Sequence, residues 1–64
     1  MFCWLVEYAG SVPYPIYVAQ GPWPTCNPWE ALYFISQPEA EVWMKEHGYI
    51  PPWTAVQHGF EDNA

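Results

Sequence analysis

Proline is the residue that most restricts how this chain can fold. Eight of its 64 residues are proline and four are glycine. Because proline fixes φ and has no backbone N–H, it interrupts helices and removes donors from sheet ladders. Long helices are therefore not expected, and the chain should form short elements separated by frequent breaks.

The hydrophobic content indicates that these short elements pack together. Hydrophobic residues make up 52% of the chain and aromatic residues 20%, whereas charged residues make up only 12%. A buried aromatic ring removes about 150–250 Å² from water, which compensates for a short chain. We therefore expect residues 1–64 to form a single small α+β domain. Some rings should stay exposed, as is typical of interfaces.

Three segments have the composition of β-strands. Residues 2–8 and 16–19 are rich in aromatic and β-branched side chains, and the turn residues between them predict a hairpin. The prolines before residues 16–19 favour an edge position for the second strand. Residues 53–58 alternate as a third strand. Two prolines in residues 21–26 predict a surface loop without regular structure.

Two capping patterns predict helical segments. Asn27, Pro28 and Glu30 predict a short helix that continues to residue 35. A second pattern at Ser36 predicts a bend, followed by a helix that begins at Gln37 and ends at the C-cap Gly48. The inward face of the first segment would carry Ala31, Phe34 and Ile35. The buried stripe of the second would carry Ala40, Trp43, Met44 and His47.

The order of these elements predicts the architecture. A right-handed crossover from the second strand would place the third strand beside the first. The expected fold is thus a three-stranded antiparallel sheet of order 2-1-3, with one bent or two short helices packed on one face. Residues 61–64 should form a frayed acidic tail.

The charge of the chain excludes several classes of function. Seven acidic side chains are opposed by Lys45, the only Lys or Arg, and the formal net charge is -6. Such a chain cannot neutralise phosphates, so we expect no direct binding of nucleic acid. The same charge would be repelled by an anionic membrane, and no apolar run approaches the roughly 18 residues of a spanning helix.

A negative field of this kind would instead attract a basic protein surface and speed association with it. The expected partner-binding residues combine acidic side chains that steer docking with tryptophans that anchor it. They are Glu30, Glu39, Glu41, Glu46, Trp23, Trp29 and Trp53. The alternative for the acidic helix face is an ordinary solvated surface, with its charges pointing into water.

The cysteines and histidines leave other chemistry open. Cys3 and Cys26 are expected to be free, small and buried, although a disulfide between them would also be compatible with the sequence. Together with His47 and His58 they would complete a zinc set, but the short spacings typical of such sites are missing. Cys26 with either histidine could form a nucleophile and base. We predict no catalytic residue, metal or cofactor.

Four segments, WLVE (4–7), NPWEALYF (27–34), EAE (39–41) and AVQHGF (55–60), together resemble small orphan proteins of bacteriophages and prophages. Those proteins similarly contain WLVE or WLIE, an Asp-Pro-x-x-Ala-Leu-x-Phe segment, an Asp-Ala-Glu helix and a closing Val-Glu-His. This chain differs by Asn27 in place of Asp, by Pro38-Glu39 before the alanine, and by Gln57 in place of Glu.

The resemblance implies a function, because small acidic phage proteins include anti-CRISPR inhibitors that often occlude a nucleic-acid-binding surface of a host defence complex. The expectation is a non-enzymatic inhibitor that mimics nucleic acid and binds a bacterial protein in the host cytoplasm. The first residues lack a basic segment and Glu7 interrupts the apolar run, so no secretory leader is expected. The alternatives are a small Cys/His enzyme or metal-binding module, and a structural protein whose exposed rings are buried in a homodimer.

Overall fold

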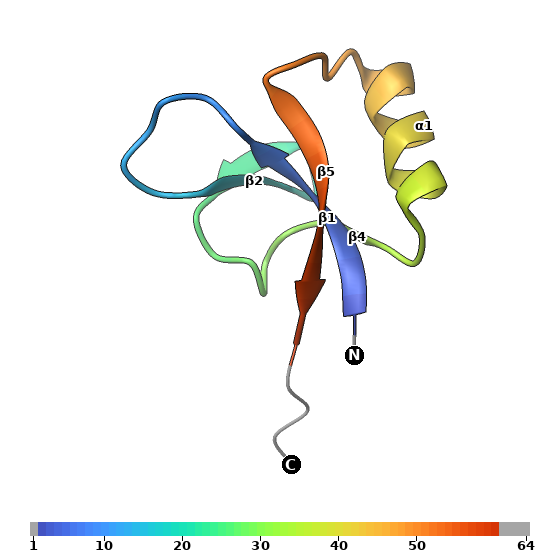
Figure 1. Cartoon of the computed structure of the whole chain (residues 1–64), viewed down its shortest axis with the longest axis horizontal. Coiled ribbons are helices and arrows are strands. Elements are labelled where there is room, and N and C mark those ends of the chain that lie inside the picture. The colour runs from blue at the N-terminus through green and yellow to red at the C-terminus, as the bar shows by residue number, and fades with distance from the viewer. Residues whose placement is uncertain (1, 61–64) are drawn as a thin grey trace.

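The first strand, β1 (Phe2–Tyr8), is the centre of the fold in the computed structural model. The structure describes residues 2–60, so the predicted acidic tail at 61–64 lies outside the described residues. Strand β5 (Trp53–Gly59) pairs antiparallel with β1 along its whole length. Because β5 occupies one edge of β1, strands β2 (Ile16–Ala19) and β4 (Tyr33–Phe34) share the other edge. Strand β3 (Trp23–Thr25) extends the sheet beyond β2 (Figure 1).

The α+β class and the antiparallel sheet agree with the prediction from sequence, but the sheet has five strands instead of three. The predicted hairpin of β1 and β2 is confirmed, and so is the position of β5 beside β1. The predicted edge position of β2 is wrong, because β3 pairs with its other side. The predicted irregular loop over residues 21–26 is wrong, because it contains β3. Pro24 is tolerated there because β3 lies at a sheet edge, where a missing N–H leaves no ladder partner unsatisfied.

The predicted helix after Asn27 is also wrong, since the chain makes only one turn at this point. The Asn27 side chain does accept a hydrogen bond, from the Trp29 N–H at 3.0 Å. The Asn27 carbonyl accepts another from the Glu30 N–H at 3.0 Å. Hydrogen bonds of this kind form where a capping residue begins a helix, and here they form as the sequence pattern predicts.

The turn ends because β2 competes for the next backbone groups. Leu32 donates its N–H to the Val18 carbonyl at 2.8 Å, and Ala31 forms a β-bridge with Ala19. The chain then continues into β4. Of the three residues predicted to face inward, Ala31 is buried and Phe34 half-buried, whereas Ile35 is exposed.

Helix α1 (Gln37–His47) confirms the second capping pattern. The Ser36 hydroxyl accepts a hydrogen bond from the Glu39 N–H at 3.4 Å, and Gly48 ends the helix with a left-handed φ of 76°. Its residues Ala40 and Met44 are buried as predicted, and Trp43 is half-buried. No helix in the described part of the chain is long and apolar enough to span a membrane.

The predicted burial of His47 is wrong, because its side chain is exposed. The residue lies in the last turn of α1, and its ring stacks on Trp43 with ring centroids 4.2 Å apart. Its Nδ1 lies 2.9 Å from the Trp43 carbonyl oxygen. The periodicity therefore identifies the correct helix face, but the packing of that face ends one turn before the helix does.

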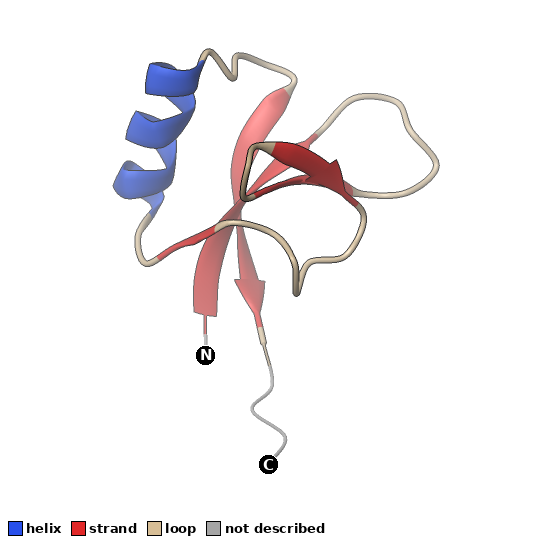
Figure 2. Cartoon of the chain, turned by 180° about the vertical axis from the view of Figure 1, so that it is seen from behind, coloured by secondary structure: helices blue, strands red, loops and turns tan. Residues whose placement is uncertain are grey.

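Buried side chains lie on both faces of the sheet. Alternate residues of β1 point in opposite directions, so Leu5 packs with Tyr17 and Ala31 on one face, while Val6 packs with Val18 and Met44 on the other. Helix α1 covers the second face. The segment between β3 and β4 crosses the first face, in front of β1 and β5 in Figure 2.

Replacing Leu5 by Ala should show how much the fold depends on β1. Leu5 is fully buried, so Leu5→Ala should lower the free energy of unfolding by about 2–5 kcal/mol in urea denaturation. The matched control Ile50→Ala removes an exposed side chain and should change that free energy by less than about 0.5 kcal/mol. Equal stability of the two variants would contradict the central position of β1.

Candidate functional site

A groove beside α1 combines an apolar floor with two carboxylates. It has a volume of about 440 Å³, and its lining comes from α1 and from β4. The lining residues are Phe34, Pro38, Glu39, Val42, Trp43 and Glu46. We call this feature the α1 groove. Four of its residues are spaced i, i+3, i+4 and i+7 along α1, which places them on one stripe of the helix.

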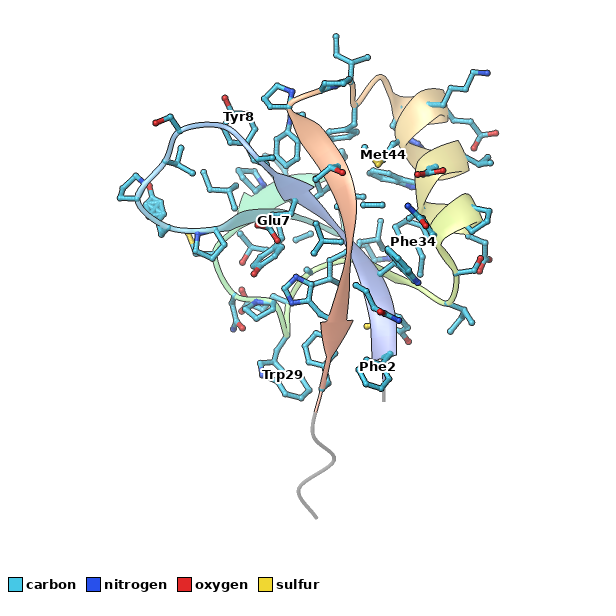
Figure 3. The ribbon with its side chains drawn as sticks, viewed as in Figure 1. Phe2, Glu7, Tyr8, Trp29, Phe34 and Met44 are labelled. Atoms are coloured by element: carbon cyan, nitrogen blue, oxygen red, sulfur yellow. The ribbon has the colours of Figure 1, made fainter. Side chains whose placement is uncertain are left out.

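The fold creates the α1 groove by the way α1 packs. Ala40 and Met44 turn toward the sheet, so the neighbouring stripe of the helix is left outside, with Val42 55% exposed. Phe34 reaches the helix from β4, and its ring centroid lies 5.7 Å from that of Trp43. Figure 3 shows Phe34 and Met44 on the side of the sheet that carries α1.

The two carboxylates of the groove have no cationic partner. Glu39 receives a long hydrogen bond of 3.5 Å from the Ser36 hydroxyl, and Glu46 has no hydrogen-bond or ion-pair partner among the described residues. Lys45 likewise forms no ion pair within residues 2–60. The negative charge at the groove is therefore not neutralised by the described part of the chain.

The other predicted acidic residues lie outside the groove. Glu41 follows a different side of α1 and accepts a hydrogen bond from Gln37 Nε2 at 3.2 Å. Glu30 lies in the turn before β4 and accepts one from the Thr25 hydroxyl at 3.1 Å. The structure thus brings Glu39 and Glu46 together and separates the remaining two from them.

The three predicted tryptophans do not gather at one place. Trp23 on β3 and Trp29 in the following turn are 68% and 70% exposed. Trp29 packs edge-to-face on Phe60 with centroids 4.6 Å apart, away from α1 in Figure 3. Trp53 is half-buried between Tyr8 and Tyr49, with ring centroids 5.2 Å from each. Trp53 is thus packed among other aromatic rings and is not an exposed anchor.

Sequence reasoning missed Phe34 and Val42 as site residues. Val42 stands between Glu39 and Glu46 at helical spacing, and this apolar residue within an acidic stripe was the available signal. No comparable signal marks Phe34, because the same segment was expected to be helical. Its contribution to the groove depends on the pairing of β4 with β1.

The cysteines do not support the alternative chemistry. Both are free thiols: Cys3 is buried as expected, whereas Cys26 is exposed, contrary to the expectation. Burial raises the pKa of Cys3, which disfavours the reactive thiolate. Cys26 has no hydrogen bond to either histidine, and His58 instead contacts Glu7 at 3.4 Å. Within residues 2–60, no three His, Cys, Asp or Glu side chains converge as metal ligands would.

Comparison with known proteins found no relative of this chain. No protein-family model, no curated protein and no solved structure matches the chain. The phage resemblance of its four segments therefore stays a prediction from sequence. The interpretation of the α1 groove depends on its own geometry and charge.

Two buried acids should make the fold sensitive to alkaline pH. Burial raises the pKa of Tyr17, with a further contribution from Glu7, and burial also raises that of Cys3. Because the folded chain holds both protons more tightly than the unfolded chain, their contribution to stability is complete below pH 9 and is lost as pH rises through the folded pKa values. Urea denaturation between about pH 7 and about pH 11 should show this decline in the free energy of unfolding.

The variant Tyr17→Phe removes one of the two acids while keeping the buried ring. Its free energy of unfolding should decline less steeply above about pH 10 than that of the wild-type chain. An identical decline in both proteins would show that Tyr17 does not contribute to the pH dependence.

Proposed function

We propose that this chain is a non-enzymatic interaction protein that binds a basic surface of another protein through the α1 groove. The observation that carries the proposal is the pairing of an exposed apolar floor with two carboxylates that no described cation neutralises. In protein interfaces, a few residues in well-packed central pockets commonly supply most of the binding free energy.

Net charge supports the same proposal. The formal net charge of -6 would draw a basic partner toward the chain and raise the association rate, an effect that falls with added salt. Once the partner is close, Val42 and the ring edges of the groove would contribute through burial of apolar surface. Charge would therefore govern the encounter, and the apolar floor would govern the lifetime of the complex.

The biological role that we propose is based on the phage resemblance. The partner would be a bacterial host protein in the cytoplasm, most specifically a defence complex of the CRISPR type whose basic surface binds nucleic acid. Glu39 and Glu46, seven residues apart on α1, lie about 10.5 Å apart along the helix axis. Their carboxylates would occupy positions that phosphates otherwise take, and the complex would be inhibited by occlusion.

Two charge-matched variants test this proposal. Glu39→Gln with Glu46→Gln and Glu30→Gln with Glu41→Gln each remove two negative charges, but only the first pair flanks the groove. In a strain with active CRISPR immunity, the wild-type chain should restore plaque formation by a targeted phage and should co-purify with the defence complex. The groove pair should weaken binding to that complex by about tenfold or more at low salt, and the control pair by about threefold or less.

Circular dichroism should show that both variants stay folded. Equal weakening by the two pairs would mean that the overall field, and not the α1 groove, binds the partner. If the wild-type chain neither restored plaques nor bound the defence complex at low salt, the anti-defence role would be wrong.

A second candidate is self-association through β5. Within residues 2–60, the outer edge of β5 pairs with no other strand, and Trp53–Gly59 contains none of the Lys, Asp, Glu or Pro residues that commonly protect sheet edges. A second copy could add its own β5 there in an antiparallel, two-fold symmetric pair.

Light scattering tests this candidate directly. A dimer would have twice the 7.4 kDa mass of one chain. Replacing the exposed Gln57 by Lys would place two like charges near the symmetric edge and should lower the dimer fraction. A mass of 7.4 kDa at all concentrations up to about 1 mM would contradict self-association.

A further inference from the structure

We infer that the α1 groove recognises an amphipathic basic helix, which places one apolar side chain between Phe34 and Val42 and a cation at each of Glu39 and Glu46. This inference depends on the proposed function, because it names the structural class of the partner segment at the same site.

The space and floor of the groove indicate the apolar side chain. A volume of about 440 Å³ is at the small end of ligand pockets, so the groove suits one or two side chains better than a large ligand. Phe34 and Val42 supply apolar surface there. A partner with only charged groups would leave this surface in water and gain nothing from it.

We expect the cations at the carboxylates because Trp43 already stacks with two other rings of the chain. His47 stacks on Trp43 with an interplanar angle of 18°, and Tyr49 stacks on it at 22° with centroids 5.2 Å apart. These stacked rings reduce the Trp43 surface that is open to a cation–π contact with a partner Lys or Arg. Glu39 and Glu46 are the groups left at the groove that attract a cation.

The spacing of the carboxylates favours a helix over an extended strand. Glu39 and Glu46 are about 10.5 Å apart along α1, and two residues at i and i+7 of a partner helix have the same separation. On one face of a strand, residues recur about every 6.6 Å, so pairs lie about 6.6 or 13 Å apart. A helix with cations at i and i+7 and an apolar residue at i+3 or i+4 matches all three features of the groove.

Designed peptides test this inference without knowledge of the natural partner. The probe is an alanine-based helical peptide with Lys at i and i+7 and Leu at i+3. The matched control has the same composition but carries its second Lys at i+5, which turns that charge to the opposite side of the helix. Calorimetry at low salt should show binding of the probe at least about tenfold tighter than binding of the control. NMR should place the largest shifts on Val42 and the Trp43 indole.

A matched pair of protein variants locates the contact. Val42→Gln and Ile50→Gln each replace an exposed apolar side chain by a polar one, and only Val42 lines the groove. The first should weaken probe binding by about tenfold, and the second should leave it unchanged. Equal binding of probe and control peptide, or full binding by the Val42→Gln protein, would overturn the inference.

The two proposals can fail separately. If the designed helix does not bind, but Glu39→Gln with Glu46→Gln still weakens capture of the defence complex, then the partner segment is not a helix and the proposed function stands. If the helix binds with the expected spacing preference but no defence complex is inhibited, the recognition chemistry is correct and the biological role is wrong.

Discussion

The pairing of β1 on both of its edges is the interaction on which the rest of the structure depends. β5 pairs with one edge over the full length of β1, and the short strands β2 and β4 share the other. Because neighbouring β1 residues point to opposite faces, Leu5 and Val6 can both be fully buried only if both faces are covered. The chain meets this requirement with two small cores, one beneath α1 and one beneath the segment before β4.

Contacts between aromatic rings hold α1 against the sheet. Neighbouring ring centroids 5.2–5.7 Å apart connect β4, α1, the connection after it, and β5. The ring sequence is Phe34, Trp43, Tyr49 and Trp53. Rings in such tilted, stacked or edge-to-face arrangements contribute beyond their buried area. Phe34 and Trp43 of this row also line the α1 groove, so contacts that hold α1 in place also shape the groove.

The proposed binding surface lies on the stripe of α1 beside the one that packs on the sheet. Ala40 and Met44 pack against the sheet, and the next stripe of the helix carries Val42 between the carboxylates of Glu39 and Glu46. Negative charge alone does not single out this surface, because acidic residues greatly outnumber the one Lys or Arg of the chain. The apolar residue within the acidic stripe distinguishes this part of the surface from an evenly solvated one.

The sequence by itself determined the elements whose signals are local. Aromatic and β-branched composition identified β1, and alternation identified β5. A capping serine with a glycine C-cap identified α1, together with Glu39 and Glu46 on its acidic face. The tertiary structure decided the conformation after Asn27, where an equally good capping pattern yields one turn because Leu32 donates its N–H to Val18 of β2. It also decided the strand at 23–25 and the contribution of Phe34 to the groove. A cap needs only neighbouring residues, whereas the continuation of a helix depends on whether a distant strand competes for the same backbone groups.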